Sequence, residues 1–142
     1  MFRVYSKGCE YGIRALSALT ELDCKDGFSI ETVCRRTRLP VWFTRKVFQK
    51  LVRQNVLFAK CGPGGGYYFK KNPEDISFLD LIQAVDGNVF QKCILGKAKC
   101  RRSQSCPIHS TWGKIKKVLM SELRSVSVKQ LMESRNRVLH VS

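Results

Sequence analysis

Three cysteines in the second half of the chain are the residues whose type and spacing bear most directly on chemistry. Cys93, Cys100 and Cys106 are separated by six and then five residues, which is wider than the Cys-x-x-Cys pairs typical of structural zinc. Three thiolates on one loop can still hold an iron–sulfur cluster, and a non-cysteine fourth ligand makes such a cluster more labile. The cysteines alone therefore leave three interpretations: metal or cluster binding, thiol redox sensing, or no chemical role.

Basic residues surround these cysteines and also dominate the chain as a whole. The neighbours that favour thiolates and offset the negative charge of a thiolate-ligated cluster are Lys97, Lys99, Arg101 and Arg102. The full chain has 26 Lys and Arg against 11 Asp and Glu, a formal net charge of +15. Such a surface attracts polyanions, so nucleic acid is the expected partner. An ordinary basic protein or a membrane-surface binder is the alternative.

Two short helices separated by a tight turn are predicted in the first part of the chain. Apolar residues at helical spacing predict an amphipathic helix over 9–22. Ser29 can cap a second helix, which Leu39 and Pro40 end, and a third helix is expected from about 41 to 54. The second and third helices flank the turn as in a helix-turn-helix.

Strand-forming residues follow the third helix on both sides of a glycine-rich run. The segments 56–59 and 67–69 enclose Gly62-Pro63-Gly64-Gly65-Gly66. This pattern predicts a β-hairpin, or wing, directly after the third helix, which is the expected recognition helix. A phosphate-binding nucleotide loop is the rival interpretation. It fails because no Lys-Ser or Lys-Thr pair follows the glycines and a strand, rather than a helix, comes next.

DNA contacts are expected from the third helix and from the wing. Residues in the first half of a recognition helix reach base edges, and the candidates here are Trp42, Thr44, Arg45, Lys46 and Gln49. Arg45 is suited to a two-pronged pair with guanine. Candidates for phosphate contacts are Lys50, Arg53, Lys60, Lys70 and Lys71, and the backbone of Gly64, Gly65 and Gly66 can approach the DNA closely. The alternative is a solvated basic face on a packing helix.

The rest of the chain is expected to hold a dimerisation element. A short helix over 77–86 ends at Gly87, a basic loop spans about 91–106, and a helix over about 107–126 carries an apolar stripe that favours pairing with another chain. The predicted fold is mainly α with a small β-hairpin wing. Residues 1–76 form the winged helix-turn-helix domain, and 77–142 hold the cysteine loop, the dimerisation helix and a C-terminal segment that packs back.

The chain shows no targeting or catalytic signature. Charged residues interrupt the first twenty positions and no transmembrane-length apolar run follows, so a cytoplasmic location is expected. Structural disulfides are disfavoured there, so the seven cysteines are expected to be small buried hydrophobic residues, metal ligands or redox thiols. No nucleophile–base motif, paired carboxylates or cofactor fingerprint is found, so the chain is not expected to be an enzyme.

Several short motifs, taken together, resemble the Rrf2 family of bacterial transcription regulators over nearly the whole chain. They are Lys7-Gly8 with Tyr11 and Arg14-Ala15-Leu16, the wing Gly62-Pro63-Gly64-Gly65-Gly66-Tyr67, Ile82-Gln83-Ala84-Val85-Asp86-Gly87, and the three-cysteine loop ending in Cys106-Pro107. The family includes the iron–sulfur regulator of cluster assembly, a nitric-oxide-sensing repressor and the rhizobial iron regulator. The resemblance implies a homodimer, joined by crossing C-terminal helices, that binds a partly palindromic operator, usually as a repressor.

The resemblance also implies a cofactor and its ligands. In relatives, cysteines matching Cys93, Cys100 and Cys106 hold a 2Fe–2S or 4Fe–4S cluster that senses iron, redox state or nitric oxide. The fourth ligand varies among them. Two candidates are present here: His109 of the same chain, or Glu10 contributed by the partner subunit. The competing interpretation makes Glu10 a solvated helix residue and His109 a capping group.

Some positions depart from the family pattern. Cys61 stands where relatives often have an arginine that enters the minor groove, and Lys60 is a possible substitute. Arg45 and Lys46 replace the acid–amide pair of the cluster-assembly regulator, so its operator preference is not carried over. Buried packing is the default for Cys24 and Cys34, and the pattern does not explain Cys9. A zinc- or thiol-based redox regulator on the same scaffold is the alternative function.

Overall fold

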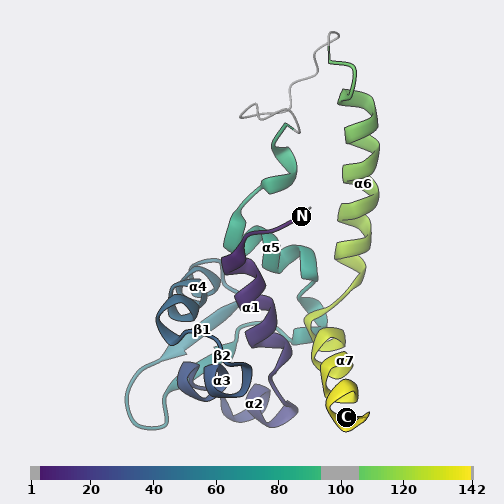
Figure 1. The fold of residues 1–142 in the computed structure, drawn as a ribbon. Coiled ribbons are helices and arrows are strands. Elements are labelled where there is room, and N and C mark those ends of the chain that lie inside the picture. Colours follow the sequence, from purple (N-terminus) through teal and green to yellow (C-terminus); the bar gives the residue numbers. More distant parts are fainter. Residues whose placement is uncertain (1–3, 94–105, 142) are drawn as a thin grey trace.

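The structure is a computed structural model that describes residues 4–93 and 106–141. It is mostly helical with one antiparallel hairpin, which confirms the predicted fold class (Figure 1). The helices are α1 (Lys7–Ser17), α2 (Glu21–Asp26), α3 (Ile30–Thr37), α4 (Val41–Arg53), α5 (Phe78–Asp86), α6 (His109–Ser125) and α7 (Val128–Val141). The strands are β1 (Leu57–Lys60) and β2 (Gly66–Phe69), and the short 3-10 helices are η1 (Pro73–Asp75) and η2 (Val89–Gln91).

The first helix is shorter than its apolar pattern predicts. The expected helix over 9–22 ends at Ser17, and α2 begins separately at Glu21. The break has a local cause, because Thr20 and Asp23 form a capping box: the Thr20 hydroxyl accepts from the Asp23 amide at 3.2 Å, and the Thr20 amide donates to the Asp23 carboxylate at 2.8 Å. Leu22 is consequently exposed rather than part of the helical stripe.

The helix-turn-helix forms as predicted. The Ser29 hydroxyl caps α3 by accepting from the Thr32 amide, and Arg38 ends that helix in the left-handed conformation, with a φ of 55°. Pro40 then precedes α4, whose first residue is Val41. The turn between the two helices is therefore set by backbone geometry at both of its ends.

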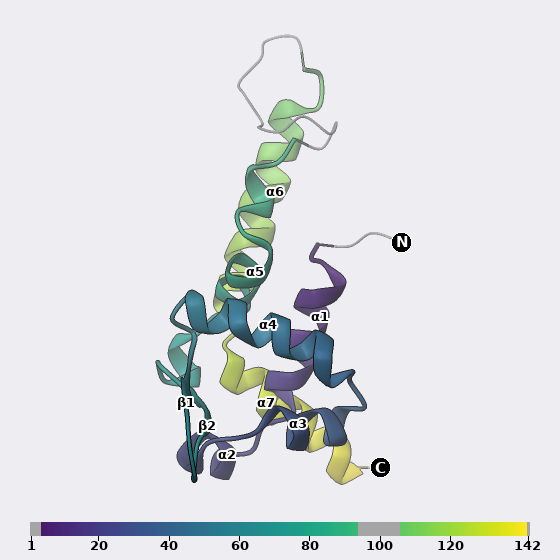
Figure 2. The ribbon, with the colours of Figure 1, turned by 90° about the vertical axis from the view of Figure 1, so that its left-hand side faces the viewer.

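A continuous core holds the helices and the hairpin together. Phe48 of α4 is fully buried and contacts the rings of Phe28 and Tyr67 edge to face, with centroids 6.1 and 5.2 Å away. Phe28 also pairs with the wing, because its amide and carbonyl bond to the carbonyl and amide of Tyr67 at 3.0 and 2.8 Å. Figure 2 shows α4 lying against α1 above the hairpin.

Helices α6 and α7 lie differently relative to the core. Helix α6 extends away from the core (Figures 1 and 2), and none of its residues is fully buried. Helix α7 returns to the core, where Val128 and Met132 are buried and the Val128 amide donates to the Ile76 carbonyl at 2.8 Å. The core thus crosses the domain division predicted at residue 76. Within the described ranges, no helix is long and apolar enough to cross a membrane.

We predict that Phe48→Ala lowers the free energy of unfolding by about 3–5 kcal/mol, because it removes a fully buried ring between two aromatic neighbours. Urea denaturation followed by circular dichroism measures the change. Trp42→Ala is the control: this ring on the same helix is 69% exposed, so its loss should shift stability by no more than about 0.5 kcal/mol. Similar losses for both variants would contradict the described packing.

Candidate nucleic-acid interface and cysteine site

One side of α4 presents the side chains predicted to meet DNA. Trp42, Arg45, Lys46 and Gln49 are all exposed, and the Lys46 ammonium lies 3.9 Å from the centre of the Trp42 indole. This cation–π contact holds a positive charge over an exposed aromatic surface. Helix α4 therefore offers an aromatic ring, two cations and an amide to solvent on one side.

Thr44 does not belong to this exposed set. Its side chain is fully buried, and its hydroxyl donates to the Pro40 carbonyl at 2.9 Å. The sequence position near the start of α4 made Thr44 a candidate for base contact. The structure corrects this expectation, because the hydroxyl is satisfied within its own helix and faces the core.

Arg45 is held by a carboxylate from the preceding helix. Its Nη2 donates to Glu31 Oε1 at 2.7 Å, and both side chains are about half exposed. Tyr67 of the wing lies within electrostatic range of both: burial raises the pKa of its hydroxyl, Arg45 lowers it and Glu31 raises it. Charged residues of α3 and α4 therefore act electrostatically on a tyrosine of the wing.

The predicted phosphate contacts are distributed over several elements. Arg53 and Lys60 are exposed, as are Lys70 and Lys71. Lys50 is also exposed, yet its Nζ donates to the Val85 carbonyl at 3.3 Å, near the end of α5. Lys50 therefore ties the recognition helix to α5 in addition to carrying charge.

The tip of the wing needs its glycines. Gly64 has a φ of 73°, and the Gly65 amide closes the turn by donating to the Gly62 carbonyl at 2.9 Å. A Cβ on Gly65 would lie 2.3 Å from the Lys60 carbonyl oxygen, so no larger residue fits without moving the loop. Gly64 has open space around it and, with Gly65, is exposed, so the backbone at this tip is accessible.

Two of the three cysteines predicted as ligands lie in the described part of the chain. Cys93 follows η2 and Cys106 lies just before α6, and both are half-buried. The third predicted ligand, Cys100, lies outside the described residues. His109 is the first residue of α6, and its amide donates to the Cys106 carbonyl at 3.3 Å. Among the residues described, no three Cys, His, Asp or Glu side chains are already gathered as a metal site.

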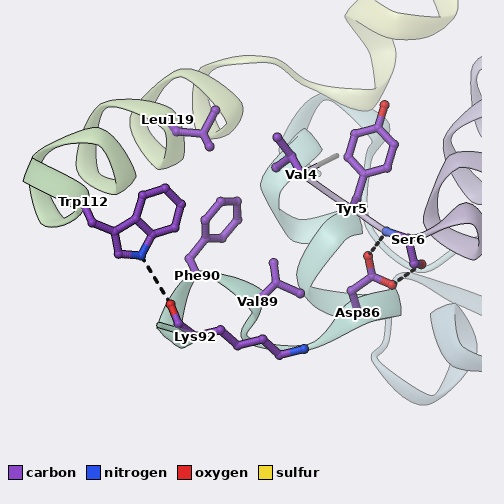
Figure 3. A pocket seen from close by; sticks show the side chains of 9 residues that line it. All are labelled: Val4, Tyr5, Ser6, Asp86, Val89, Phe90, Lys92, Trp112 and Leu119. Carbon is purple, nitrogen blue, oxygen red and sulfur yellow. Dashed lines mark hydrogen bonds between the residues drawn. The ribbon is translucent and has the colours of Figure 1, made fainter. Parts of the chain in front are cut away.

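A hydrogen bond brings the Cys93 segment to the start of α6. The Trp112 indole nitrogen donates to the Lys92 carbonyl at 3.4 Å (Figure 3). Trp112 lies three residues after His109, which places both on one side of the helix. This hydrogen bond joins the chain on either side of residues 94–105, one residue before Cys93 and within one helical turn of His109.

A cavity of about 400 Å³ lies next to this junction. Figure 3 shows an apolar lining with three polar residues; the lining residues are Val4, Tyr5, Ser6, Asp86, Val89, Phe90, Lys92, Trp112 and Leu119. The Ser6 amide donates to Asp86 Oδ2 at 2.7 Å and the Ser6 hydroxyl donates to Oδ1. The carboxylate at the end of α5 thereby anchors the start of α1, a link that the sequence did not reveal.

The other candidate fourth ligand, Glu10, lies on α1. Its carboxylate accepts from Lys7 Nζ at 3.1 Å, and Arg14 Nη1 lies 3.9 Å away. These contacts are within one helix and leave the Glu10 side chain partly exposed. The structure thus places Glu10 among neighbouring cations on its own helix.

The remaining described cysteines differ strongly in accessibility. Cys9 is fully buried, and burial together with the negative charge of Asp86 raises the pKa of its thiol to about 12. Cys34 is also buried, as predicted, whereas Cys24 is only half-buried. Burial, followed by the charges of Asp23 and Glu21, raises the pKa of Cys24. Cys61, before the wing glycines, is exposed.

A helix-turn-helix followed by a two-stranded wing, with a basic helix exposed beside the wing, defines a winged helix-turn-helix protein. Comparison with known proteins narrows this class. The sequence model of Rrf2, described as an iron-dependent transcriptional regulator, matches residues 5–134. The chain belongs to the Rrf2 family, and its relatives are helix-turn-helix transcriptional regulators rather than enzymes.

Individual relatives are distant in sequence but match over most of their length. The HTH-type transcriptional regulator IscR of Vibrio atlanticus is 26% identical over 140 residues, which cover 99% of this chain and 80% of the relative. The fold is similar to that of IscR from T. potens, with a TM-score of 0.74, 20% identity and coverage of 94% and 88% of the two chains. It is also similar to CymR, the global cysteine regulator of B. subtilis, with a TM-score of 0.73, 18% identity and coverage of 94% and 98%.

We predict that iodoacetamide at pH 8 labels Cys61 much faster than Cys9 or Cys34 in the folded protein. Cys61 is exposed, Cys34 is buried, and Cys9 combines burial with a pKa of about 12 that keeps its thiol protonated and unreactive. Peptide mass mapping over time measures each rate, and labelling in urea provides the unprotected reference. Equal rates for Cys9 and Cys61 in the folded state would contradict this arrangement.

Proposed function

We propose that this chain is a homodimeric repressor whose affinity for a partly palindromic operator is controlled by an iron–sulfur cluster on Cys93, Cys100 and Cys106. The observation that carries the proposal is the junction at the start of α6. There the Trp112–Lys92 hydrogen bond joins the segment of Cys93 to the helix that follows Cys106. The match to an iron-dependent regulator family supports the same assignment.

The donor set fits an iron–sulfur cluster. Soft thiolates suit iron, and a histidine nitrogen or a carboxylate oxygen is a workable fourth ligand. Cys106 and His109 lie at the beginning of α6, where the helix dipole favours negative charge. His109 has the simpler route to the site, because Glu10 would have to come from the partner subunit. When bound, the cluster supplies reactivity toward oxidants and nitric oxide.

The residues between the cysteine site and α4 are packed closely enough for a movement at the cysteine site to reach α4. Asp86 anchors the start of α1, and only six residues lie between Asp86 and Cys93. Helix α1 in turn lies very close to α4: a Cβ on Gly12 would be 3.0 Å from Val47 Cγ1. A displacement of the chain at Cys93 would therefore pass to the recognition helix through α1, and a small change in half-site spacing weakens operator binding.

Dimerisation is assigned to α6. Ile115 and Val118 are 49% and 64% exposed on this helix, while Leu119 and Leu123 pack toward the core. Exposed apolar residues on a helix that extends from the core favour association with a second copy of the helix. Two recognition helices related by two-fold symmetry then match a palindromic operator.

A zinc- or thiol-based redox regulator is the second candidate. The similarity in fold to CymR, which is named a global cysteine regulator, and the exposed thiol of Cys61 favour it. Iron, sulfide and zinc analysis of anaerobically purified protein separates the two: stoichiometric iron and sulfide support the cluster, whereas zinc or no metal supports the alternative.

We expect Cys93→Ala, Cys100→Ala and Cys106→Ala each to abolish the cluster absorbance and change operator affinity, because each removes one thiolate ligand. Anaerobic absorption spectra, iron and sulfide assays and DNA titrations measure the effects. Cys61→Ala is the matched control, and it should retain iron and sulfide because the side chain lies on the wing. Full iron content in all three of these variants would contradict the ligand assignment. Unchanged DNA affinity would contradict the coupling between the cluster and operator binding.

We further expect Ile115→Asp to convert the dimer to a monomer and to weaken operator binding by at least about tenfold, because a charge would enter the apolar interface and half of the DNA contacts would be lost. Sedimentation velocity and fluorescence anisotropy measure the two effects. Lys117→Asp places a carboxylate at an exposed position of α6 that lies on a different side of the helix from Ile115 and Val118, and this variant should remain dimeric. A dimeric Ile115→Asp would remove α6 as the interface.

A further inference from the structure

An ion pair on the DNA-facing side joins the two helices of the helix-turn-helix. Glu31 belongs to the first turn of α3, and its Oε1 accepts from Nη2 of Arg45 at 2.7 Å. The two side chains are 57% and 51% exposed. Ion pairs this exposed contribute little to folding, so stability gives no strong reason for a carboxylate at this position.

Both side chains start from backbone positions that the core holds in place. On α3, Ile30 next to Glu31 is buried and Ser29 caps the helix. On α4, Thr44 and Val47 are buried on either side of the turn that carries Arg45. Neither helix can rotate without exposing these residues. The approach of the guanidinium to the carboxylate is therefore set by the packing of the two helices.

The ion pair leaves most of the guanidinium available. Only Nη2 of Arg45 contacts Glu31, through one carboxylate oxygen, and an arginine side chain has five N–H donors. Arg36 provides a contrast within the same protein: its Nη1 and Nη2 both donate to Asp23, at 2.5 and 3.3 Å. Arg36 is occupied by a two-pronged contact, whereas Arg45 keeps two or more donors for another acceptor pair.

Guanine presents an acceptor pair of this kind in the major groove, at O6 and N7. We propose that Glu31 is a positioning residue for sequence recognition, holding the Arg45 fork in the orientation in which its remaining donors meet guanine. This inference rests on the proposed DNA-binding function and adds a specificity determinant to it. A carboxylate beside DNA also repels phosphates, so Glu31 contributes discrimination between bases at some cost in general affinity.

The test compares base discrimination in matched variants. Operators are selected from a random duplex library by the wild-type dimer, and titrations at one salt concentration then compare the selected duplex with duplexes in which guanine is replaced by adenine or 7-deazaguanine. The variants are Glu31→Gln, Arg45→Ala and the control Glu74→Gln. Glu74 pairs with Lys129 and is 55% exposed, so this control removes one charge from a similarly exposed pair on η1.

The expected result separates discrimination from affinity. A good two-pronged contact discriminates bases by about 5- to 150-fold. The quantity compared is the ratio of affinities for the guanine duplex and the substituted duplex. Arg45→Ala should abolish this preference at one guanine of each half-site, and Glu31→Gln should lower the ratio at the same guanine by about fivefold or more. Binding to unrelated DNA should stay equal or become tighter in Glu31→Gln. Glu74→Gln should keep the wild-type ratio, and urea unfolding midpoints should confirm that all variants are folded.

Two results would overturn the inference while leaving DNA binding intact. One is wild-type guanine discrimination in Glu31→Gln. The other is tighter and more selective guanine binding in that variant, which would mean that Glu31 withholds Arg45 from DNA instead of aiming it. Failure of the wild-type protein to enrich any sequence would be a different outcome, because it would remove the proposed function together with the inference.

Discussion

The burial of one side of α4 is the constraint on which the rest of the structure depends. Val47, Phe48 and Leu51 are buried against α1, α3 and the base of the wing, and Thr44 completes this side with its hydroxyl satisfied by Pro40. A helix fixed along one side has no rotational freedom. The exposed side therefore always presents Trp42, Arg45, Lys46 and Gln49. The positive charges of Arg45 and Lys46 consequently lie on a defined surface.

The same packing gives the wing its position. Phe28 contacts Phe48 on one side and exchanges two backbone hydrogen bonds with Tyr67 on the other. The hairpin is thus attached to the core of the helix-turn-helix, although only two strands form its sheet. Isolated two-stranded hairpins are marginal in water, and this attachment explains how a short, glycine-rich wing keeps a fixed place beside the recognition helix.

The sequence predicted most of the fold because its signals are local. Helical periodicity and the Ser29 cap located α3 and α4, and the glycine run located the hairpin. Periodicity failed at the end of α1, where Leu19 and Leu22 continue the apolar pattern while the capping box of Thr20 starts a new helix. It also could not show that Thr44 faces inward, since a polar residue on a basic helix resembles a surface residue until its partner is known.

Contacts between distant residues lay beyond local patterns. Ser6 and Asp86 are eighty positions apart, and each looks like an ordinary helix-end residue by itself. The Trp112–Lys92 hydrogen bond likewise joins residues that are twenty positions apart. For the cysteines, spacing and charge left cluster binding, redox sensing and no chemical role open, and the family resemblance implied Cys93, Cys100 and Cys106 as ligands. The structure locates two of them beside α6, and their role as ligands stays a prediction.

The return of α7 to the core has a consequence for how the protein is made. Val128 and Met132 pack in the same core as Leu16 of α1 and Leu79 of α5, so the DNA-binding half needs residues that the ribosome adds more than one hundred positions after α1. During synthesis the helix-turn-helix emerges with this part of its core uncovered, and partly folded chains with exposed apolar surface are prone to associate. Completion of the fold, and with it a rigid recognition surface, must therefore wait until α7 has left the ribosome.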